Sequence, residues 1–337
     1  LDNFARTVAW CQENGLYAKG HPLFWSIPKC LPEWVKRYDQ ETFWRFAEVR
    51  VRNLVARFRG RVRCWDAVNE PLWEAAPAHL ATRRWPQMES TETLVQYIAP
   101  VLRWARQEDP AALLVINDYG LEEDARGGQE RLGSDGQPVT PARQRARFVA
   151  LMKALHQAGT PPDLLGMQAH TGWVTPSVQW RVYDELASTG LPLQVTEYWA
   201  AVEPLRALGL PPAEVEARLA QHLTETLTVA YGHPAMQGFF FWGLMDAAIV
   251  WHGEFSSHET KPCFEAVRRL LHEEWRTRAS LVSGADGLLR TPAFAGEYEL
   301  SYALPDGTPK ALRLTHEPAQ GGPLTVVLPH RPAFCTT

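Results

Sequence analysis

The sequence predicts an α/β protein in which a parallel sheet is covered by helices. Short apolar runs of strand length alternate with amphipathic stretches of helical length, and the runs are apolar along most of their length. Continuous apolar strands indicate a sheet that is buried on both faces, as in parallel α/β proteins. Polar or aromatic side chains also stand at the end of each run, and in a parallel barrel the carboxyl ends of the strands build the active site.

Six runs have the length and the β-branched or bulky residues of strands. They are Leu16–Trp25, Val62–Glu70, Ala112–Tyr119, Leu164–His170, Leu193–Glu197 and Met236–Gly243. The predicted helices between them are Thr42–Phe58, Thr91–Gln107, Pro141–Ala158 and Pro212–Val229. The first of these helices repeats apolar residues at the three-to-four spacing of one buried face.

The residue pattern of the chain changes after a further predicted helix, Pro262–Arg276. From about Ser283, turn signals such as Asp306-Gly307 separate short alternating runs, including Tyr298–Ala303 and Leu324–Leu328, which predicts a small antiparallel β appendage. We therefore predict two domains, residues 1–282 and 283–337. Two long segments, 71–90 and 121–140, follow predicted strand ends, where barrel enzymes place substrate loops.

Composition excludes several classes of protein. The chain has 337 residues and a net charge of −4 with interspersed signs, so it offers no basic stripe for nucleic acid. No apolar run approaches the roughly 20 residues that span a bilayer. Five scattered cysteines form no Cys-x-x-Cys pair, which argues against a disulfide scaffold and a zinc site. One of them, Cys64, lies in a predicted strand and is expected to be a small buried apolar residue.

Tryptophan is abundant, with 14 residues. Indole faces stack on sugar rings, although most tryptophans in a protein are packing residues. The strand ends carry a set of polar and aromatic side chains that a purely structural barrel does not need: His21 with Trp25, Asn69 with Glu70, Asn117 to Tyr119, Gln168 with His170, Glu197, and Trp242 with Asp246. Two of these, Glu70 and Glu197, close strands, and a pair of facing carboxylates is what glycoside hydrolysis requires.

At these residues the chain resembles glycoside hydrolase family 10, the xylanase family. Trp65-Asp66-Ala67-Val68-Asn69-Glu70 is similar to the family's WDVVNE acid/base motif, and Val195-Thr196-Glu197 to its nucleophile motif. Further similarities are Gly20 to Trp25 with Pro32-Glu33-Trp34, Gly166 to His170, and Trp242 to Asp246 with Trp251. The similarity covers roughly Asn3 to Arg276.

The resemblance implies a role for each matched residue. Glu70 would be the general acid/base and Glu197 the nucleophile, with their carboxyl groups about 5–5.5 Å apart if configuration is retained. Asn69 would donate to the sugar 2-hydroxyl, and Gln168 and His170 could orient the two glutamates. His21 and Trp25 would line the glycone side, and Trp242 and Trp251 would enclose the sugar at the cleavage point. Tyr119 either reaches the aglycone side or packs at the rim.

Two residues depart from the family pattern. The family usually has an aspartate two positions after the nucleophile, where it holds the histidine of the Gln-x-His segment, and this chain has Trp199. His170 therefore loses an expected carboxylate partner, for which Glu203 is a nearby substitute in the sequence. The family often has histidine where this chain has Ser26.

Family members begin with two further strands, so the resemblance implies a TIM (β/α)8 barrel of which this chain carries six βα units, plus the β-rich C-terminal extension. We expect the chain alone to be an open arc of low stability, because two parallel edges are exposed. A cooperative melt at high temperature would count against that. The chain starts at Leu1 without a visible signal peptide. We expect the full-length product to be secreted or to act at the cell envelope.

The expected function is endo-acting hydrolysis of β-1,4-xylosidic bonds in xylan by double displacement, without a metal or other cofactor. The expected partner is the polysaccharide, not nucleic acid or a membrane, and the expected state is a monomer. One alternative is the same chemistry on another β-glycan. Another is a barrel that binds carbohydrate without turnover. The C-terminal β region is either a structural cap or an accessory sugar-binding module.

Overall fold

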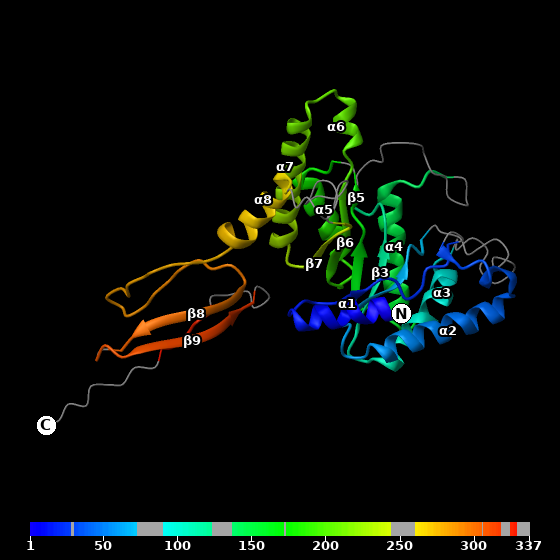
Figure 1. Ribbon diagram of the computed structural model, residues 1–337, viewed down its shortest axis with the longest axis horizontal. Coiled ribbons are helices and arrows are strands. Elements are labelled where there is room, and N and C mark those ends of the chain that lie inside the picture. Colours follow the sequence, from blue (N-terminus) through cyan, green and yellow to red (C-terminus); the bar gives the residue numbers. More distant parts are fainter. Residues whose placement is uncertain are drawn as a thin grey trace. The chain divides into compact units, whose positions relative to one another are not determined.

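The computed structural model describes residues 1–27, 30–72, 90–122, 137–171, 173–243, 260–304, 306–317 and 324–328 (Figure 1). Contacts divide the chain into two compact units, Leu1–Phe264 and Glu265–Thr337. The predicted domain boundary at Ser283 stays a prediction.

The first unit is built on a curved parallel sheet (Figure 1). Its strands are β1 (Lys19–Gly20), β2 (Cys64–Asn69), β3 (Leu113–Asp118), β4 (Leu164–Met167), β5 (His170–Thr171), β6 (Leu193–Ala200) and β7 (Met236–Phe241). The order is β1-β2-β3-β4-β6, with β5 and β7 both paired to β6. All these pairs are parallel. The predicted fold class is confirmed, since this is the open wall of a TIM barrel followed by a small antiparallel sheet.

Two predicted strands are shorter than expected. The run Leu16–Trp25 contributes only β1 and an isolated bridge from Phe24 to Val68. Its first residues are half exposed, and Pro22 has no amide hydrogen for a sheet. The run Leu164–His170 divides into β4 and β5 because Ala169 adopts a positive φ of 56°.

Helices accompany the sheet. They are α1 (Asp2–Glu13), α2 (Gln40–Arg57), α3 (Thr91–Glu108), α4 (Pro141–Gln157), α5 (Pro176–Ala187), α6 (Glu203–Ala207) and α7 (Pro212–Gly232). Three of them contact the sheet directly: α3 packs on β2, α5 on β6 and α7 on β7. A 3-10 turn covers Val35–Arg37. The side chains of Asp39, Ser90 and Thr140 accept hydrogen bonds from backbone amides in the first turns of α2, α3 and α4, which fixes where these helices begin. The four helices predicted between the strands are found within a few residues of their expected bounds, whereas the predicted helix Pro262–Arg276 is α-helical only to Arg269.

The buried centre of the sheet is formed by β2, β3, β4 and β6, as continuous apolar strands require. Cys64 lies in β2 and is fully buried, and burial raises the pKa of its thiol to about 11. The thiol is therefore protonated at neutral pH and serves as a small packing group, as predicted. No helix in the described ranges is long and apolar enough to cross a membrane.

The second unit contains the end of α8 (Pro262–Arg269), a π-helical turn (Leu270–Glu274) and an antiparallel hairpin. The hairpin pairs β8 (Gly296–Ala303) with β9 (Pro309–His316). Between them Gly307 takes a φ of 83°, and the Asp306 carboxylate accepts a hydrogen bond from the Thr308 amide at 2.9 Å. This is the turn that Asp306-Gly307 predicts. The predicted strand Leu324–Leu328 has no regular secondary structure.

Candidate active site

The strand register brings the predicted site residues to one edge of the sheet. Asn69 at the end of β2 pairs with Asn117 near the end of β3, and Asn117 pairs with Gly166 of β4. Gly166 in turn pairs with Gln194 of β6, three residues before Glu197. Because these strands are parallel neighbours, their carboxyl ends meet at the same edge.

Asn117 lies at the centre of a buried hydrogen-bond network. Its side chain is inaccessible to solvent. Its amide Nδ2 donates to Asn69 Oδ1 at 2.8 Å and to Glu197 Oε1 at 3.0 Å. Its Oδ1 accepts from the Thr196 hydroxyl at 2.6 Å. Both amide hydrogens and the carbonyl oxygen are thus used, and the network fixes the orientation of the amide.

Glu197 is a buried carboxylate with three polar neighbours. Its side chain is 6% exposed, and its Oε2 lies 3.1 Å from His170 Nε2. Its Oε1 accepts from Asn117 and lies 3.8 Å from His21 Nδ1. The His170 approach has the distance of an ion pair but not the angle of a hydrogen bond. Asn117 therefore donates a hydrogen bond to Glu197, and one imidazole nitrogen lies near each carboxylate oxygen.

Glu70 follows directly after β2 and has an unusual backbone. Its φ is 52°, the left-handed region that non-glycine residues rarely adopt. The Glu70 amide donates to the Asn117 carbonyl at 2.7 Å, and Gln168 Nε2 donates to Glu70 Oε1 at 2.8 Å. Such a conformation costs of order 1–3 kcal/mol and persists where the surroundings enforce it, often at functional sites. The turn directs the half-buried Glu70 side chain toward Gln168.

A second buried carboxylate, Asp66, positions His21. Asp66 lies inside β2, and its Oδ2 is 2.9 Å from His21 Nδ1. Its other oxygen, Oδ1, is 2.8 Å from Lys19 Nζ, and both side chains are nearly buried. The Asp66 contact places the proton on His21 Nδ1 and fixes the ring. The Trp25 ring lies edge-on to His21, with centroids 6.3 Å apart.

Two tryptophan rings, those of Trp199 and Trp242, lie close to the His170 ring. The centroid of Trp199 is 6.0 Å away at an interplanar angle of 81°, and that of Trp242 is 5.1 Å away at 59°. Trp242 is 55% exposed. Glu203, the carboxylate considered from the sequence as a substitute partner, is exposed at the start of α6. The position of the expected aspartate is therefore taken by an indole edge.

The remaining residues singled out from the sequence are Tyr119, Trp251 and Ser26. Tyr119 follows β3 and is half-buried; its carbonyl accepts from the Gln144 side chain. Its role at the aglycone side or in rim packing stays a prediction. Trp251 lies outside the described residues, as do most of the two long segments after β2 and β3. Ser26 is buried and hydrogen-bonds to the Tyr97 hydroxyl, so this departure from the family pattern is a packing residue.

Sequence reasoning noted Asn117 at a strand end and Asp66 and Thr196 inside motifs, but it gave none of these three residues a role in the site. The signal was available, because each is a polar residue inside an otherwise apolar strand. A buried polar group in a strand requires partners, and here the partners are the predicted site residues. Within the described ranges no cluster of three or more His, Cys, Asp or Glu side chains is arranged to hold a metal ion.

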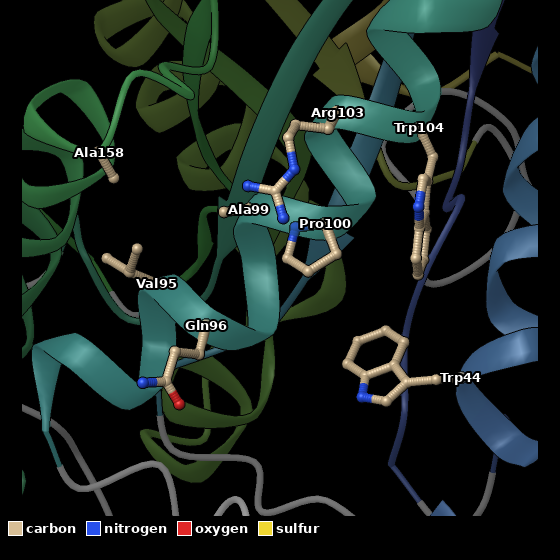
Figure 2. A pocket seen from close by; sticks show the side chains of 8 residues that line it. All are labelled: Trp44, Val95, Gln96, Ala99, Pro100, Arg103, Trp104 and Ala158. Atoms are coloured by element: carbon tan, nitrogen blue, oxygen red, sulfur yellow. The ribbon is translucent and has the colours of Figure 1, made fainter. Parts of the chain in front are cut away.

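A cavity of about 770 Å³ lies elsewhere, among helices (Figure 2). It is lined by Trp44 of α2, by α3 residues from Val95 to Trp104, and by Ala158 after α4. Its lining includes none of the predicted site residues. The chemistry of the strand ends therefore defines the candidate site better than this hollow does.

A curved parallel sheet with two glutamates and an amide network at its carboxyl edge defines a protein of the TIM-barrel class with an acidic site. The sequence pattern of Glycosyl hydrolase family 10 matches residues 1–268. The chain belongs to this family.

Two similar proteins carry different names, one as a xylanase and the other as an anti-sigma factor. Endo-1,4-beta-xylanase B of Thermotoga neapolitana is 26% identical over 289 residues, covering 80% of this chain and 74% of that protein. Anti-sigma-I factor RsgI6 of Acetivibrio thermocellus is 26% identical over 303 residues, covering 88% of this chain. The chain spans only 34% of the length of that factor.

Solved structures show the same fold. Xylanase 10B from Thermotoga petrophila, crystallised with xylobiose, superposes with a TM-score of 0.62 at 21% identity. The match covers 80% of this chain and 78% of that one.

Proposed function

We propose that this chain carries the catalytic site of an endo-1,4-β-xylanase that hydrolyses xylan with retention of configuration. The observation that carries the proposal is the Asn117 network. It joins Asn69 and Glu197, and Gln168 Nε2 donates both to Asn69 Oδ1 at 3.4 Å and to Glu70 Oε1 at 2.8 Å. An acid, a nucleophile and a sugar-binding amide therefore share one set of hydrogen bonds. A binding protein has no need of two carboxylates held in this relation.

In the first step Glu197 attacks the anomeric carbon and Glu70 protonates the leaving oxygen. This breaks the glycosidic bond and forms a glycosyl ester on Glu197. In the second step Glu70 takes a proton from water, which displaces Glu197 and restores both carboxyl groups. The buried Glu197 carboxylate suits the nucleophile, because Asn117 donates to one oxygen and His170 Nε2 lies 3.1 Å from the other. The half-buried Glu70 suits a group that exchanges protons with water.

The orientation of the Asn69 side chain leaves its amide nitrogen as a hydrogen-bond donor for the sugar. Its Oδ1 accepts from Asn117, so its amide nitrogen remains as the donor that faces substrate. A donor to the 2-hydroxyl strengthens as the oxocarbenium-like transition state forms. His21 and Trp25 would form the glycone side, and the exposed Trp242 ring would stack on the sugar at the cleavage point.

The size of the polymeric substrate also indicates where in relation to the cell the protein acts. Xylan is too large to enter a cell, so we propose that the full-length product acts outside the cytoplasm or at the cell envelope, as a monomer. Relatives named as xylanases support the substrate.

The second candidate is carbohydrate binding without turnover. A relative of equal identity is named as an anti-sigma factor rather than as an enzyme, and position 199 departs from the family pattern. Both Glu70 and Glu197 would then be dispensable for binding. Another β-glycan as substrate is a third candidate, which a panel of polysaccharides would separate from xylan.

The test is hydrolysis of an aryl β-xylobioside by the wild type, Glu70→Ala and Glu197→Ala. We expect Glu197→Ala to lose about 10³-fold or more in kcat/KM, which corresponds to about 4 kcal/mol. Azide should rescue both variants with opposite stereochemistry: an α-glycosyl azide from Glu197→Ala and a β-glycosyl azide from Glu70→Ala. A wild type that binds xylo-oligosaccharides without hydrolysis would establish the binding alternative instead.

A further inference from the structure

Trp199 faces His170 across a short strand pair. His170 and Trp199 are register partners between β5 and β6, and the Trp199 amide donates to the Ala169 carbonyl at 3.1 Å. Figure 1 shows β5 beside the carboxyl half of β6. The backbone therefore sets the distance between the two side chains, and the indole presents its ring at 81° to the imidazole.

The other neighbour of His170 is Trp242, which is also tied to β6. The Trp242 amide donates to the Tyr198 carbonyl at 3.1 Å. Its ring centroid is 5.1 Å from that of His170. Two indoles whose backbone is bonded to β5 or β6 thus lie near the His170 imidazole, and His170 Nε2 lies 3.1 Å from Glu197 Oε2.

The Trp199 side chain carries no charge and therefore cannot hold the His170 ring through an ion pair. Among the described residues, Glu197 is the carboxylate within ion-pair distance of the His170 ring. An aspartate at position 199 would offer the imidazole a second anion. An indole ring instead offers dispersion and ring electrostatics, which depend on the orientation of the two rings and not on a charge.

We propose that Trp199 is a positioning residue: by packing, it holds the His170 ring so that Nε2 stays within ion-pair distance of the Glu197 carboxylate. The role rests on the proposed function, in which Glu197 is the nucleophile. Trp199 acts through His170 and does not itself contact the reacting atoms. A loosened imidazole leaves the nucleophile with one fewer fixed neighbour, and small misplacements at a reacting group are costly in rate.

The test uses 2,4-dinitrophenyl 2-deoxy-2-fluoro-β-xylobioside, which forms the glycosyl ester but turns over slowly. Labelling of Glu197 is followed by mass spectrometry. We expect Trp199→Ala to lower the maximal labelling rate about 10–100-fold with little change in the concentration at half-maximal rate. Trp199→Phe retains an aromatic edge and should stay within about 5-fold of the wild type.

A double-variant cycle shows whether the effect passes through His170. In a His170→Ala background, Trp199→Ala should have almost no further effect on the labelling rate. Additive losses in the two variants would overturn the proposal, as would an unchanged rate in Trp199→Ala. Trp180→Ala is the matched control, because Trp180 lies edge-on to His233 at 4.9 Å on α5, away from the site.

A second readout does not depend on activity. The His170 Hε1 resonance, assigned by its loss in His170→Ala, should be single in the wild type and in Trp199→Phe. It should broaden or split in Trp199→Ala, because the ring then samples more than one orientation. A single sharp resonance in Trp199→Ala would overturn the proposal. An unlabelled wild type with the expected resonances would instead overturn the proposed function.

Discussion

Asn117 illustrates how one side chain can organise a site that it does not occupy. Its amide is shared between Asn69, on the sugar side, and Glu197, the proposed nucleophile. A hydrogen bond to a charged group contributes about 1.5–3 kcal/mol, and a buried acceptor left without its donor costs a similar amount. Asn117 therefore affects both the position of the nucleophile and the direction in which Asn69 points.

We predict that Asn117→Ala lowers kcat/KM on an aryl xylobioside by about 10–100-fold, because one to three kcal/mol of positioning is lost. Asn117→Asp keeps the shape but replaces the donor by an acceptor beside Glu197, so its loss should be at least as large. Asn14→Ala is the control, since exposed Asn14 donates only to the Trp10 carbonyl. Wild-type activity in Asn117→Asp would refute this role.

At the scale of elements, β4 approaches its neighbours so closely that it requires glycine. A Cβ on Gly166 would lie 2.7 Å from Asn117 Oδ1 and 2.8 Å from Val115 Cγ1. Both neighbours belong to β3, which cannot move away without disturbing the site. The side chain that orients Glu197 therefore occupies the space that a larger residue in β4 would need.

We predict that Gly166→Ala destabilises the protein by about 1–3 kcal/mol and lowers kcat/KM together with it, because Asn117 must shift. Gly232→Ala is the matched control: the nearest atom to its added Cβ would be 3.9 Å away, on Trp180. Urea unfolding and kcat/KM measure the two effects. A stable Gly166→Ala protein with full activity would contradict the close approach.

Helix α7 joins β6 through a buried histidine. The Tyr198 hydroxyl lies 2.7 Å from His222 Nδ1, and the Trp173 ring centroid is 4.6 Å from that of His222. Burial lowers the pKa of His222 below its usual 6.5. The folded state therefore favours the neutral ring, and the unfolded state binds a proton first as the pH falls.

We predict that the free energy of unfolding decreases as the pH drops below about 6.5, with His222 contributing at most about 1.4 kcal/mol per pH unit. The contribution ends below the pKa of the folded state, where both states are protonated. In His222→Gln the slope over this window should be shallower, whereas His156→Gln, at an exposed position of α4, should keep the wild-type slope. The slope of the unfolding free energy against pH is measured by urea unfolding at several pH values between about 5 and 7.5. An identical slope in His222→Gln would exclude this contribution.

At the scale of the whole molecule, the candidate site and the C-terminal hairpin belong to different units. Every described site residue lies within Leu1–Phe264, and in the part of the chain that the structure describes β8 and β9 pair with each other in a separate two-stranded sheet. An isolated two-stranded hairpin is marginally stable. Its half-buried face carries Tyr298, Leu300 and Leu314, which suits packing more than catalysis.

We predict that a chain ending at residue 282 retains kcat/KM on an aryl xylobioside within about twofold, because no described site residue is removed. A loss of hydrolysis with unchanged small-substrate binding would assign the hairpin a part in catalysis. Unchanged aryl xylobioside hydrolysis with weaker binding to insoluble xylan would favour the accessory sugar-binding role over a structural cap.

The sequence alone predicted the parallel sheet, the helices and the two glutamates, because these depend on local periodicity and on motifs contiguous in the chain. The division of β4 from β5 was not predicted, because it depends on the positive φ of Ala169, and the short β1 was not predicted although Pro22 is visible in the sequence. Boundaries of this kind are set by backbone conformation, which apolar patterns do not encode.

Glu70 and Glu197 could be recognised from the sequence because each stands in a contiguous motif at the end of an apolar strand. The partners that hold them could not, because hydrogen bonds between strands depend on register. The tertiary structure alone decided that Asn117 reaches both Asn69 and Glu197, that Asp66 and not a more distant carboxylate holds His21, and that Trp199 packs on His170. The physical reason is that a parallel sheet juxtaposes residues that are about 30 to 80 positions apart in these pairs, at distances that no local pattern specifies.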